Sequence, residues 1–226
     1  MSPFLDFRAA LKTVRTTLDE RQFRRTFRKY RDFTMIPKDI YVSNLHLAST
    51  IRNIPGGIVE CGTWRGGMIA GIADTLGPGR HYRLFDSFEG LPPAQAIDGE
   101  AALAWQRNTS GFLYHNNCQA SKSEAEQAMS MSAAKDYTIV KGWFRETLPG
   151  ALVEPVALLR LDADWYDSTK EILCHLADCV VPGGVIVVDD YYVYEGCTLA
   201  VNEYAAARKW MIRQYWPGGV CYIIVR

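Results

Sequence analysis

The stretch Gly57-Ile-Val-Glu-Cys-Gly-Thr-Trp-Arg-Gly-Gly67 decides the fold, because an apolar segment in it runs directly into a glycine-rich turn. We predict a strand over Ile58–Cys61 and a helix over Gly67–Leu76. Glycines at 62, 66 and 67 let backbone amides approach a ligand, and a helix N-terminus favours an anion. The spacing is neither GxGxxG nor a phosphate loop ending in GK[ST]. A purely structural turn fits these residues equally well.

Short β-rich segments alternate with helical ones on the C-terminal side of this turn. Further strands are expected at Tyr82–Phe85, Thr138–Val140, Val156–Leu161 and Val185–Val188. Further helices are expected at Ser123–Ala134, Ser168–Cys179 and Leu199–Met211. Two more strands, Met211–Tyr215 and Cys221–Val225, surround a tight turn and imply an antiparallel edge strand. This order predicts an α/β fold with a doubly wound, mostly parallel sheet and helices on both faces.

Length, charge and hydropathy narrow the classes of protein. A chain of 226 residues fits one α/β domain, and 25 basic against 25 acidic residues argue against nucleic-acid binding. The apolar runs are too short to span a membrane, and Met1–Ala10 lacks the apolar centre of a signal peptide. The six cysteines include no CxxC pair, so we expect them to be reduced. We therefore expect a cytoplasmic protein that acts on a small molecule, without nucleic acid or membrane partners.

The N-terminal segment differs from the rest of the chain. Arginines crowd residues 21–31, and Phe23, Phe27 and Tyr30 recur at helical spacing. We expect residues 1–50 to form a helical segment and residues 51–226 to form the main domain. The basic face either is solvated while the helix packs on the domain, or belongs to a lid or subunit contact.

Residues Glu89–Ser121 form a segment too long for an ordinary connection. Its length indicates a cover that closes over the substrate. It contains Trp105, Phe112, Tyr114 and His115. The imidazole of His115 is a candidate proton acceptor, and an ordinary surface histidine is the alternative.

Two acids follow the first two predicted strands. Glu60 could pair with the ammonium side of an amino-acid ligand, and Asp86 could accept hydrogen bonds from ribose hydroxyls. Trp143 or Phe144 after the third strand could lie against an adenine ring, although core packing explains a lone aromatic equally well.

Four more aspartates follow the next two strands: Asp162 and Asp164, then Asp189 and Asp190. The carboxyl ends of parallel strands meet at one edge, so these acids are expected to converge and to need a cation. Oxygen ligands favour Mg²⁺, or Mn²⁺ or Ca²⁺, and we assign Asp162, Asp189 and Asp190 as the ligands. Helix capping by one or two of them is the alternative. Asp164 is the second candidate proton acceptor.

Five ordered motifs resemble the bacterial macrocin-type O-methyltransferase family, across about Gly56 to Arg226. They are Glu60-Cys-Gly-Thr-Trp-Arg-Gly-Gly67, Asp86-Ser-Phe-Glu-Gly-Leu-Pro92, Gly142-Trp-Phe-Arg-Glu-Thr-Leu-Pro149, Leu161-Asp-Ala-Asp-Trp-Tyr166 and Pro182-Gly-Gly-Val-Ile-Val-Val-Asp-Asp-Tyr191. The resemblance implies a Rossmann-like class I methyltransferase fold with seven strands.

The resemblance also implies S-adenosylmethionine as methyl donor and Mg²⁺ as cofactor. The expected donor residues are Glu60, Gly62, Thr63, Trp64, Arg65, Gly66, Asp86, Ser87, Gly142, Trp143, Phe144 and Asp162. The metal arrangement is similar to that of catechol O-methyltransferase, but the position of that enzyme's lysine base corresponds to about Trp165.

The expected activity is methyl transfer to a hydroxyl of a natural-product sugar or phenol whose neighbouring oxygens chelate the metal. A homo-oligomer, dimer or tetramer, is a family expectation. The rival interpretations are an NAD-dependent oxidoreductase, against which the missing GxGxxG counts, and a nucleotide-binding or non-catalytic protein of the same fold.

Overall fold

The computed structural model describes residues 18–111, 114–151 and 155–226. The predictions for Met1–Ala10 and Phe112 lie outside these residues. The helices are α1 (described over 18–30), α2 (Lys38–Thr50), α3 (Gly67–Leu76), α4 (Glu100–Arg107), α5 (His115–Cys118), α6 (Lys122–Ser130), α7 (Phe144–Thr147), α8 (Tyr166–Leu176) and α9 (Glu195–Arg208). The strands are β1 (Gly57–Cys61), β2 (His81–Asp86), β3 (Asp136–Lys141), β4 (Val156–Leu161), β5 (Val180–Val188), β6 (Ile212–Tyr215) and β7 (Val220–Ile224).

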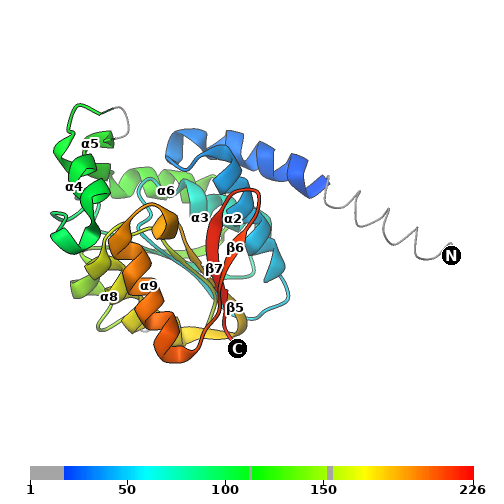
Figure 1. Ribbon diagram of the computed structural model, residues 1–226. Helices are drawn as coiled ribbons and strands as arrows, with labels where there is room; N and C mark the ends of the chain where they lie inside the picture. The colour runs from blue at the N-terminus through cyan, green and yellow to red at the C-terminus, as the bar shows by residue number, and fades with distance from the viewer. Residues whose placement is uncertain (1–17, 112–113, 152–154) are drawn as a thin grey trace, which may run out of the picture.

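The strands form one seven-stranded sheet in the order β3-β2-β1-β4-β5-β7-β6, which confirms the predicted fold class (Figure 1). All pairs from β3 to β5 are parallel. Strand β7 runs antiparallel to β5 and to β6, so the antiparallel pairing lies at one edge of the sheet. The order reverses between β1 and β4, and ligands of such sheets bind beyond the strand ends at that point.

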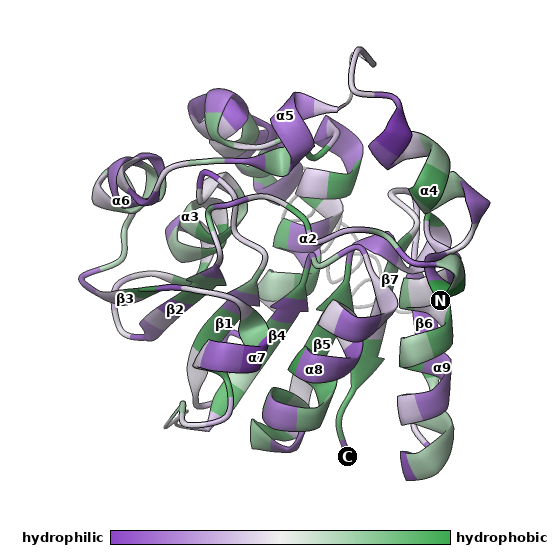
Figure 2. Ribbon diagram, turned by 90° about the vertical axis from the view of Figure 1, so that its left-hand side faces the viewer, coloured by the Kyte–Doolittle hydropathy of each residue, from purple (hydrophilic) through white to green (hydrophobic). Residues whose placement is uncertain are grey.

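Helices cover both faces of the sheet, and the strands divide their side chains between them. On β1, Ile58 packs with the cluster that includes α2 and α3, whereas Val59 and Cys61 pack with the cluster that includes α8 and α9. This alternation with period two explains why the central strands are apolar along nearly their whole length (Figure 2). Among the described residues, no helix combines the length and apolar character needed to cross a membrane.

Helix α1 packs on the domain through its aromatic side and exposes its basic side. Phe23 and Tyr30 are fully buried, and the Tyr30 hydroxyl donates to Asp74 of α3 at 3.0 Å. Lys29 pairs with the same carboxylate at 2.7 Å. The described part of the basic face is thus mostly solvated, and the division of the chain at residue 50 stays a prediction.

The long segment between β2 and α6 contains helix α4, which the sequence analysis missed. Its sequence, Glu100-Ala-Ala-Leu-Ala-Trp-Gln-Arg107, consists largely of strong helix formers. Asp98 joins this segment to the domain, because its buried carboxylate accepts the backbone N–H of Tyr166 at 2.7 Å. The described part of this segment is therefore attached to the first turn of α8.

Candidate active site

The site begins where five neighbouring strands, β3, β2, β1, β4 and β5, end together. One row of backbone hydrogen bonds crosses this edge of the sheet: Gly142 N–H to Asp86, Gly62 N–H to Phe85, Asp162 N–H to Cys61, and Asp189 N–H to Leu161, each at 2.9 Å. The row fixes the first residue after β3, β1, β4 and β5 beside a neighbouring strand. The convergence expected from strand order is therefore built by the backbone.

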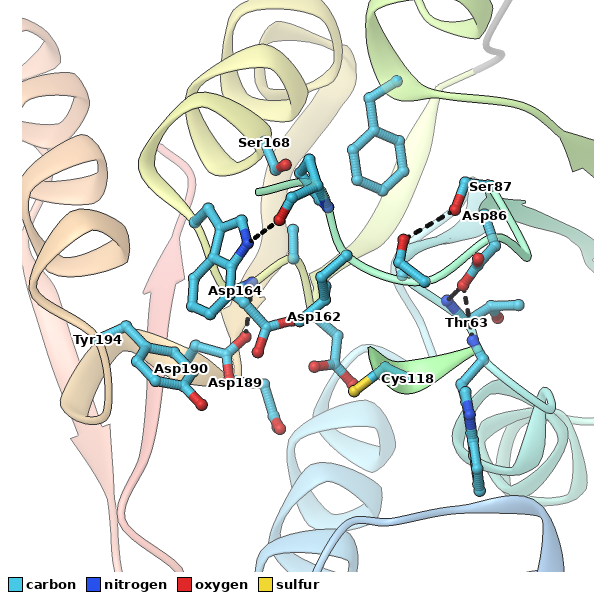
Figure 3. A pocket seen from close by; sticks show the side chains of 18 of the residues that line it. Thr63, Asp86, Ser87, Cys118, Asp162, Asp164, Ser168, Asp189, Asp190 and Tyr194 are labelled. Carbon is cyan, nitrogen blue, oxygen red and sulfur yellow. Dashed lines mark hydrogen bonds between the residues drawn. The ribbon is translucent and has the colours of Figure 1, made fainter. Parts of the chain in front are cut away.

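A cavity of about 1530 Å³ opens above this row. Most of the predicted site residues line it: Glu60, Gly62, Thr63, Trp64, Asp86, Ser87, His115, Gly142, Trp143, Phe144, Asp162, Asp164, Asp189 and Asp190 (Figure 3). Arg65 and Gly66 are not among its lining residues. Residues 33–37, between α1 and α2, also contribute to the wall.

Arg65 and Gly66 support the glycine turn from behind. The Arg65 Nε lies 2.9 Å from a Glu124 carboxylate oxygen on α6, and its guanidinium lies 4.3 Å from the centre of the Trp64 ring. A side chain on Gly66 would approach the backbone of Ala125, also on α6. These two residues hold the turn against α6.

Asp86 organises the turn by accepting backbone hydrogen bonds. One carboxylate oxygen accepts the N–H groups of Thr63 and Trp64, both at 2.7 Å, and the other accepts that of Phe88 at 2.6 Å. Burial raises the pKa of Asp86, and these three N–H groups oppose that rise. Asp86 thus shapes the loop, in addition to lining the cavity where a ribose was expected.

Three carboxylates meet on the other side of the cavity. Asp162, Asp164 and Asp190, which we call the acid cluster, each place one oxygen within 4.8 Å of the others. Burial, followed by repulsion from the neighbouring carboxylates, raises the pKa of Asp164 and of Asp190 well above the ordinary value. Ionising all three carboxylates at once is costly unless a cation compensates their charge. The arrangement fits a hard divalent cation with oxygen ligands.

Asp189 lies next to the acid cluster but points one oxygen at a buried arginine. Its Oδ1 accepts a hydrogen bond from Arg160 Nη2 at 2.6 Å. Burial raises the pKa of Asp189 to about 6, while Arg160 acts in the opposite direction. The structure therefore groups Asp162 and Asp190 with Asp164, whereas Asp189, the third expected ligand, is not part of this group and pairs with Arg160.

Arg160 is the site residue that the sequence analysis missed. It lies within β4, Val156-Ala-Leu-Leu-Arg-Leu161, where every residue is buried. Glu60, expected to pair with a ligand, instead pairs with Arg160 at 3.1 Å and accepts the Thr63 hydroxyl at 2.6 Å. The signal was present in the sequence, because a charged residue inside an otherwise apolar strand must find buried partners.

Aromatic rings form the side of the cavity next to the acid cluster. Trp165 is almost fully buried, and its ring centre lies 6.2 Å from that of Trp105 and 4.9 Å from that of Tyr194. The indole N–H of Trp165 donates to the Pro92 carbonyl at 2.9 Å, which fixes the ring against the cover. We call Trp105, Trp165 and Tyr194 the aromatic wall. Such a surface suits the flat face of a ring.

The candidate base His115 lies in an unusual turn of the cover. All four residues of α5 have positive φ, between 45° and 60°, so the turn is left-handed. Asn117 holds it, because its side chain donates to the Leu91 carbonyl at 2.8 Å and its backbone carbonyl accepts the Leu91 N–H at 3.0 Å. His115 is exposed at the cavity, with its ring 6.2 Å from that of Trp64. The structure places it near Trp64 of the glycine turn.

Both aromatic residues that follow β3 line the cavity. Phe144 lines the cavity and also packs against the core beside α8. Trp143, which precedes the first turn of α7, also lines the cavity. The cavity thus offers an aromatic surface where an adenine ring was expected.

The family described as Macrocin-O-methyltransferase (TylF) matches residues 12–213 of this sequence. The chain belongs to the macrocin-O-methyltransferase family. This membership confirms the resemblance of the five motifs, and the acid cluster and glycine turn both lie inside the matched range.

Several relatives of this macrocin-O-methyltransferase family member act in natural-product chemistry. The demethyldecarbamoylnovobiocin O-methyltransferase of Streptomyces niveus is 35% identical over 163 residues, which are 69% of this chain and 60% of the relative. The mycinamicin III 3''-O-methyltransferase of Micromonospora griseorubida is 31% identical over 69% of this chain and 63% of the relative. The chain thus spans about three fifths of the length of these relatives.

Solved structures agree with the fold. The O-methyltransferase NovP superposes with a TM-score of 0.69 at 29% identity, over 85% of this chain and 82% of NovP. The calicheamicin methyltransferase CalS11 superposes with a TM-score of 0.60 at 20% identity, over 81% of this chain and 77% of CalS11. The second similarity concerns the fold alone.

Proposed function

We propose that this protein is an S-adenosylmethionine-dependent O-methyltransferase that needs a divalent cation, Mg²⁺ or alternatively Mn²⁺ or Ca²⁺. The observation that carries the proposal is the acid cluster, which faces the same cavity as the glycine turn of β1. A cationic sulfonium donor and a divalent cation would both compensate the acids of this cavity. The names of the relatives support hydroxyl methylation of a small molecule.

We assign the donor to the side formed by the glycine turn. Thr63, Trp64 and Ser87 would contact it, and Trp143 would cover its adenine ring. Glu60 and Asp86 act chiefly by holding the turn, since both already accept hydrogen bonds from it. The left-handed conformation of Gly62, with φ of +81°, keeps the chain close to β4 at this point.

We assign the cation to Asp162, Asp189 and Asp190. Asp162 and Asp190 lie in the acid cluster, and Asp189 has a second oxygen that Arg160 does not contact. When bound, the donor supplies the methyl group and the cation lowers the pKa of the acceptor hydroxyl. Asp164 has no ion pair among those found in the described parts of the chain. It is therefore our first choice to accept the hydroxyl proton on its carboxylate, with His115 as the alternative.

The aromatic wall defines the acceptor side. Trp165 and Tyr194 lie beside Asp164 and Asp190, so a ring resting on them would present its oxygens to the acid cluster. We therefore propose a sugar or phenol ring with two neighbouring oxygens as acceptor.

Removal of divalent cations should abolish methyl transfer. A protein treated with EDTA and then dialysed is expected to lose activity towards a catechol or a sugar diol, because the acceptor hydroxyl would no longer be acidified. Addition of Mg²⁺ or Mn²⁺ should restore it. The measurement is transfer of radiolabelled methyl groups from S-adenosylmethionine. Unchanged activity after complete chelation would refute the metal requirement and leave only the donor assignment.

A further inference from the structure

Arg160 is a fully buried cation at the centre of the site. It lies on β4, next to the strand end, and its side chain is about as inaccessible as that of Glu60 beside it. Removing a guanidinium from water is costly, so its N–H groups must be satisfied internally. Burial by itself lowers the pKa of Arg160, but the neighbouring carboxylates hold this pKa above its ordinary value.

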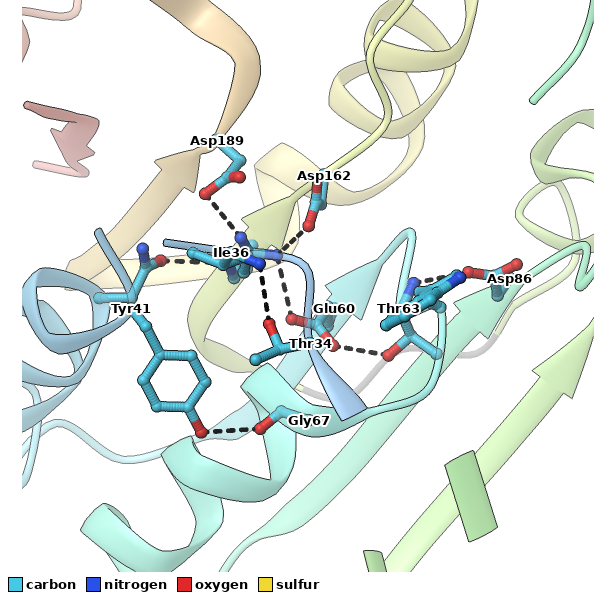
Figure 4. A network of polar contacts seen from close by, with 12 residues as sticks. Thr34, Ile36, Tyr41, Glu60, Thr63, Gly67, Asp86, Asp162 and Asp189 are labelled. Atoms are coloured by element: carbon cyan, nitrogen blue, oxygen red, sulfur yellow. Dashed lines mark hydrogen bonds and ion pairs between the residues drawn. The ribbon is translucent and has the colours of Figure 1, made fainter. Parts of the chain in front are cut away.

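Its fork satisfies four groups on four different segments (Figure 4). Nη1 donates to Glu60 Oε1 at 3.1 Å and to Asp162 Oδ2 at 2.8 Å, and Nη2 donates to Asp189 Oδ1 at 2.6 Å. Nε donates to Asn44 Oδ1 on α2 at 3.1 Å. One planar group thus connects β1, which leads into the glycine turn, with Asp162, Asp189 and helix α2.

The choice of oxygen atoms matters for binding. Arg160 contacts one oxygen of Asp162 and one of Asp189, and leaves the second oxygen of each carboxylate for another partner. It also restrains Glu60, whose other oxygen accepts the Thr63 hydroxyl at 2.6 Å and so supports the glycine turn. Three carboxylates share one guanidinium, so the network still carries excess negative charge.

We propose that Arg160 is a positioning residue that orients Asp162 and Asp189 for the cation and, through Glu60, the glycine turn for the donor. This inference rests on the proposed function, because it concerns the same two ligands. It predicts that binding at both positions depends on the shape of the guanidinium fork as well as on its charge. A single charge without the fork cannot reach all four partners.

The test is the substitution Arg160→Lys, which keeps the charge and removes the fork. Mn²⁺ affinity, measured by calorimetry without donor, is expected to fall at least about tenfold, as for other partners that orient metal ligands. The affinity for S-adenosylhomocysteine, measured without metal, should fall as well. Arg160→Lys with both affinities within about twofold of wild type would overturn the inference and make Arg160 a simple counter-charge.

Arg80→Lys provides the matched control. Arg80 also donates to several partners, the carbonyls of Ile51, Arg52 and Gly56. It directly precedes β2, so it lies at the opposite end of the strands from the site. Thermal unfolding should show that it loses stability, while both affinities stay within about twofold of wild type. Equal losses of affinity in the two variants would mean that general destabilisation is responsible, and would overturn the positioning role.

A second variant covers the case in which Arg160→Lys does not fold. Asn44→Ala removes the contact to Nε, together with the bonds of the Asn44 side chain to the Ile40 carbonyl and to Asp189, and leaves the three ion pairs of Arg160 in place. Asn44→Ala should weaken Mn²⁺ binding by roughly threefold. This loss is smaller than the one expected for Arg160→Lys, because the guanidinium keeps its three carboxylate partners. Unchanged Mn²⁺ affinity in that variant would refute the inference. A wild-type protein that binds neither Mn²⁺ nor S-adenosylhomocysteine would overturn the proposed function itself, and the inference with it.

Discussion

Asp190→Asn is expected to remove Mn²⁺ binding and to lower methyl transfer by roughly a thousandfold, since metal activation is worth several kcal/mol in such sites. Asp190 is buried, and its Oδ2 accepts the backbone N–H of Asp164 at 3.1 Å. The amide oxygen of asparagine can still accept this bond, so the fold should survive. The substitution removes one negative charge from the acid cluster, where the repulsion between carboxylates is what a cation would relieve.

Two measurements separate this effect from loss of structure. Calorimetry with Mn²⁺ reports the binding directly, and circular dichroism reports the fold. Asp178→Asn makes the same chemical change in an exposed acid that pairs with Arg208, and it should leave both affinity and activity near wild type. Wild-type Mn²⁺ affinity in Asp190→Asn would show that the cation, if any, is held elsewhere.

The sheet was predictable because its central strands are buried on both faces. Strands such as β4 leave no ambiguity about their type, and their length is limited by the glycine and proline residues around them. The expected bounds of β3 and β5 were too short: β3 is a half-exposed edge strand whose polar residues hide its ends, and β5 continues back through Pro182-Gly-Gly184 to Val180. Helix α4 has only eight residues and lies within a long connection, so its alanine-rich sequence is the one local signal for it.

The site was predictable to the extent that it depends on strand ends. Asp86, Asp162 and Asp190 could be placed together because parallel strands end at one edge. The pairing of Glu60 with Arg160 could not, because it depends on which way two side chains turn inside the core. The left-handed turn at α5 was equally hidden: asparagine tolerates positive φ, but four consecutive residues adopt it only where tertiary contacts such as those of Asn117 hold them.

Gly62→Ala tests the point on which the whole site depends. A Cβ at Gly62 would lie 1.6 Å from the carbonyl oxygen of Asp162, and φ there is +81°. The obstacle is backbone, so no side chain can rotate away, and β1 and β4 would have to separate at their ends. We expect a loss of roughly 3 to 5 kcal/mol in the free energy of unfolding, from overpacking and the left-handed conformation together.

Gly77→Ala isolates the conformational part of this cost. Gly77 follows α3 with φ of +89°, but a Cβ there would meet nothing within 4 Å. Its substitution should therefore cost only about 1 to 3 kcal/mol, the penalty for a residue other than glycine at this φ and ψ. Urea denaturation compares the two variants directly. The difference between the two losses of unfolding free energy measures how tightly the end of β1 packs against the end of β4. Equal losses would mean that the two strand ends can move apart at no cost. If the contact is as tight as it is here, Gly62→Ala should also weaken S-adenosylhomocysteine and Mn²⁺ binding together, because one displacement moves both halves of the site.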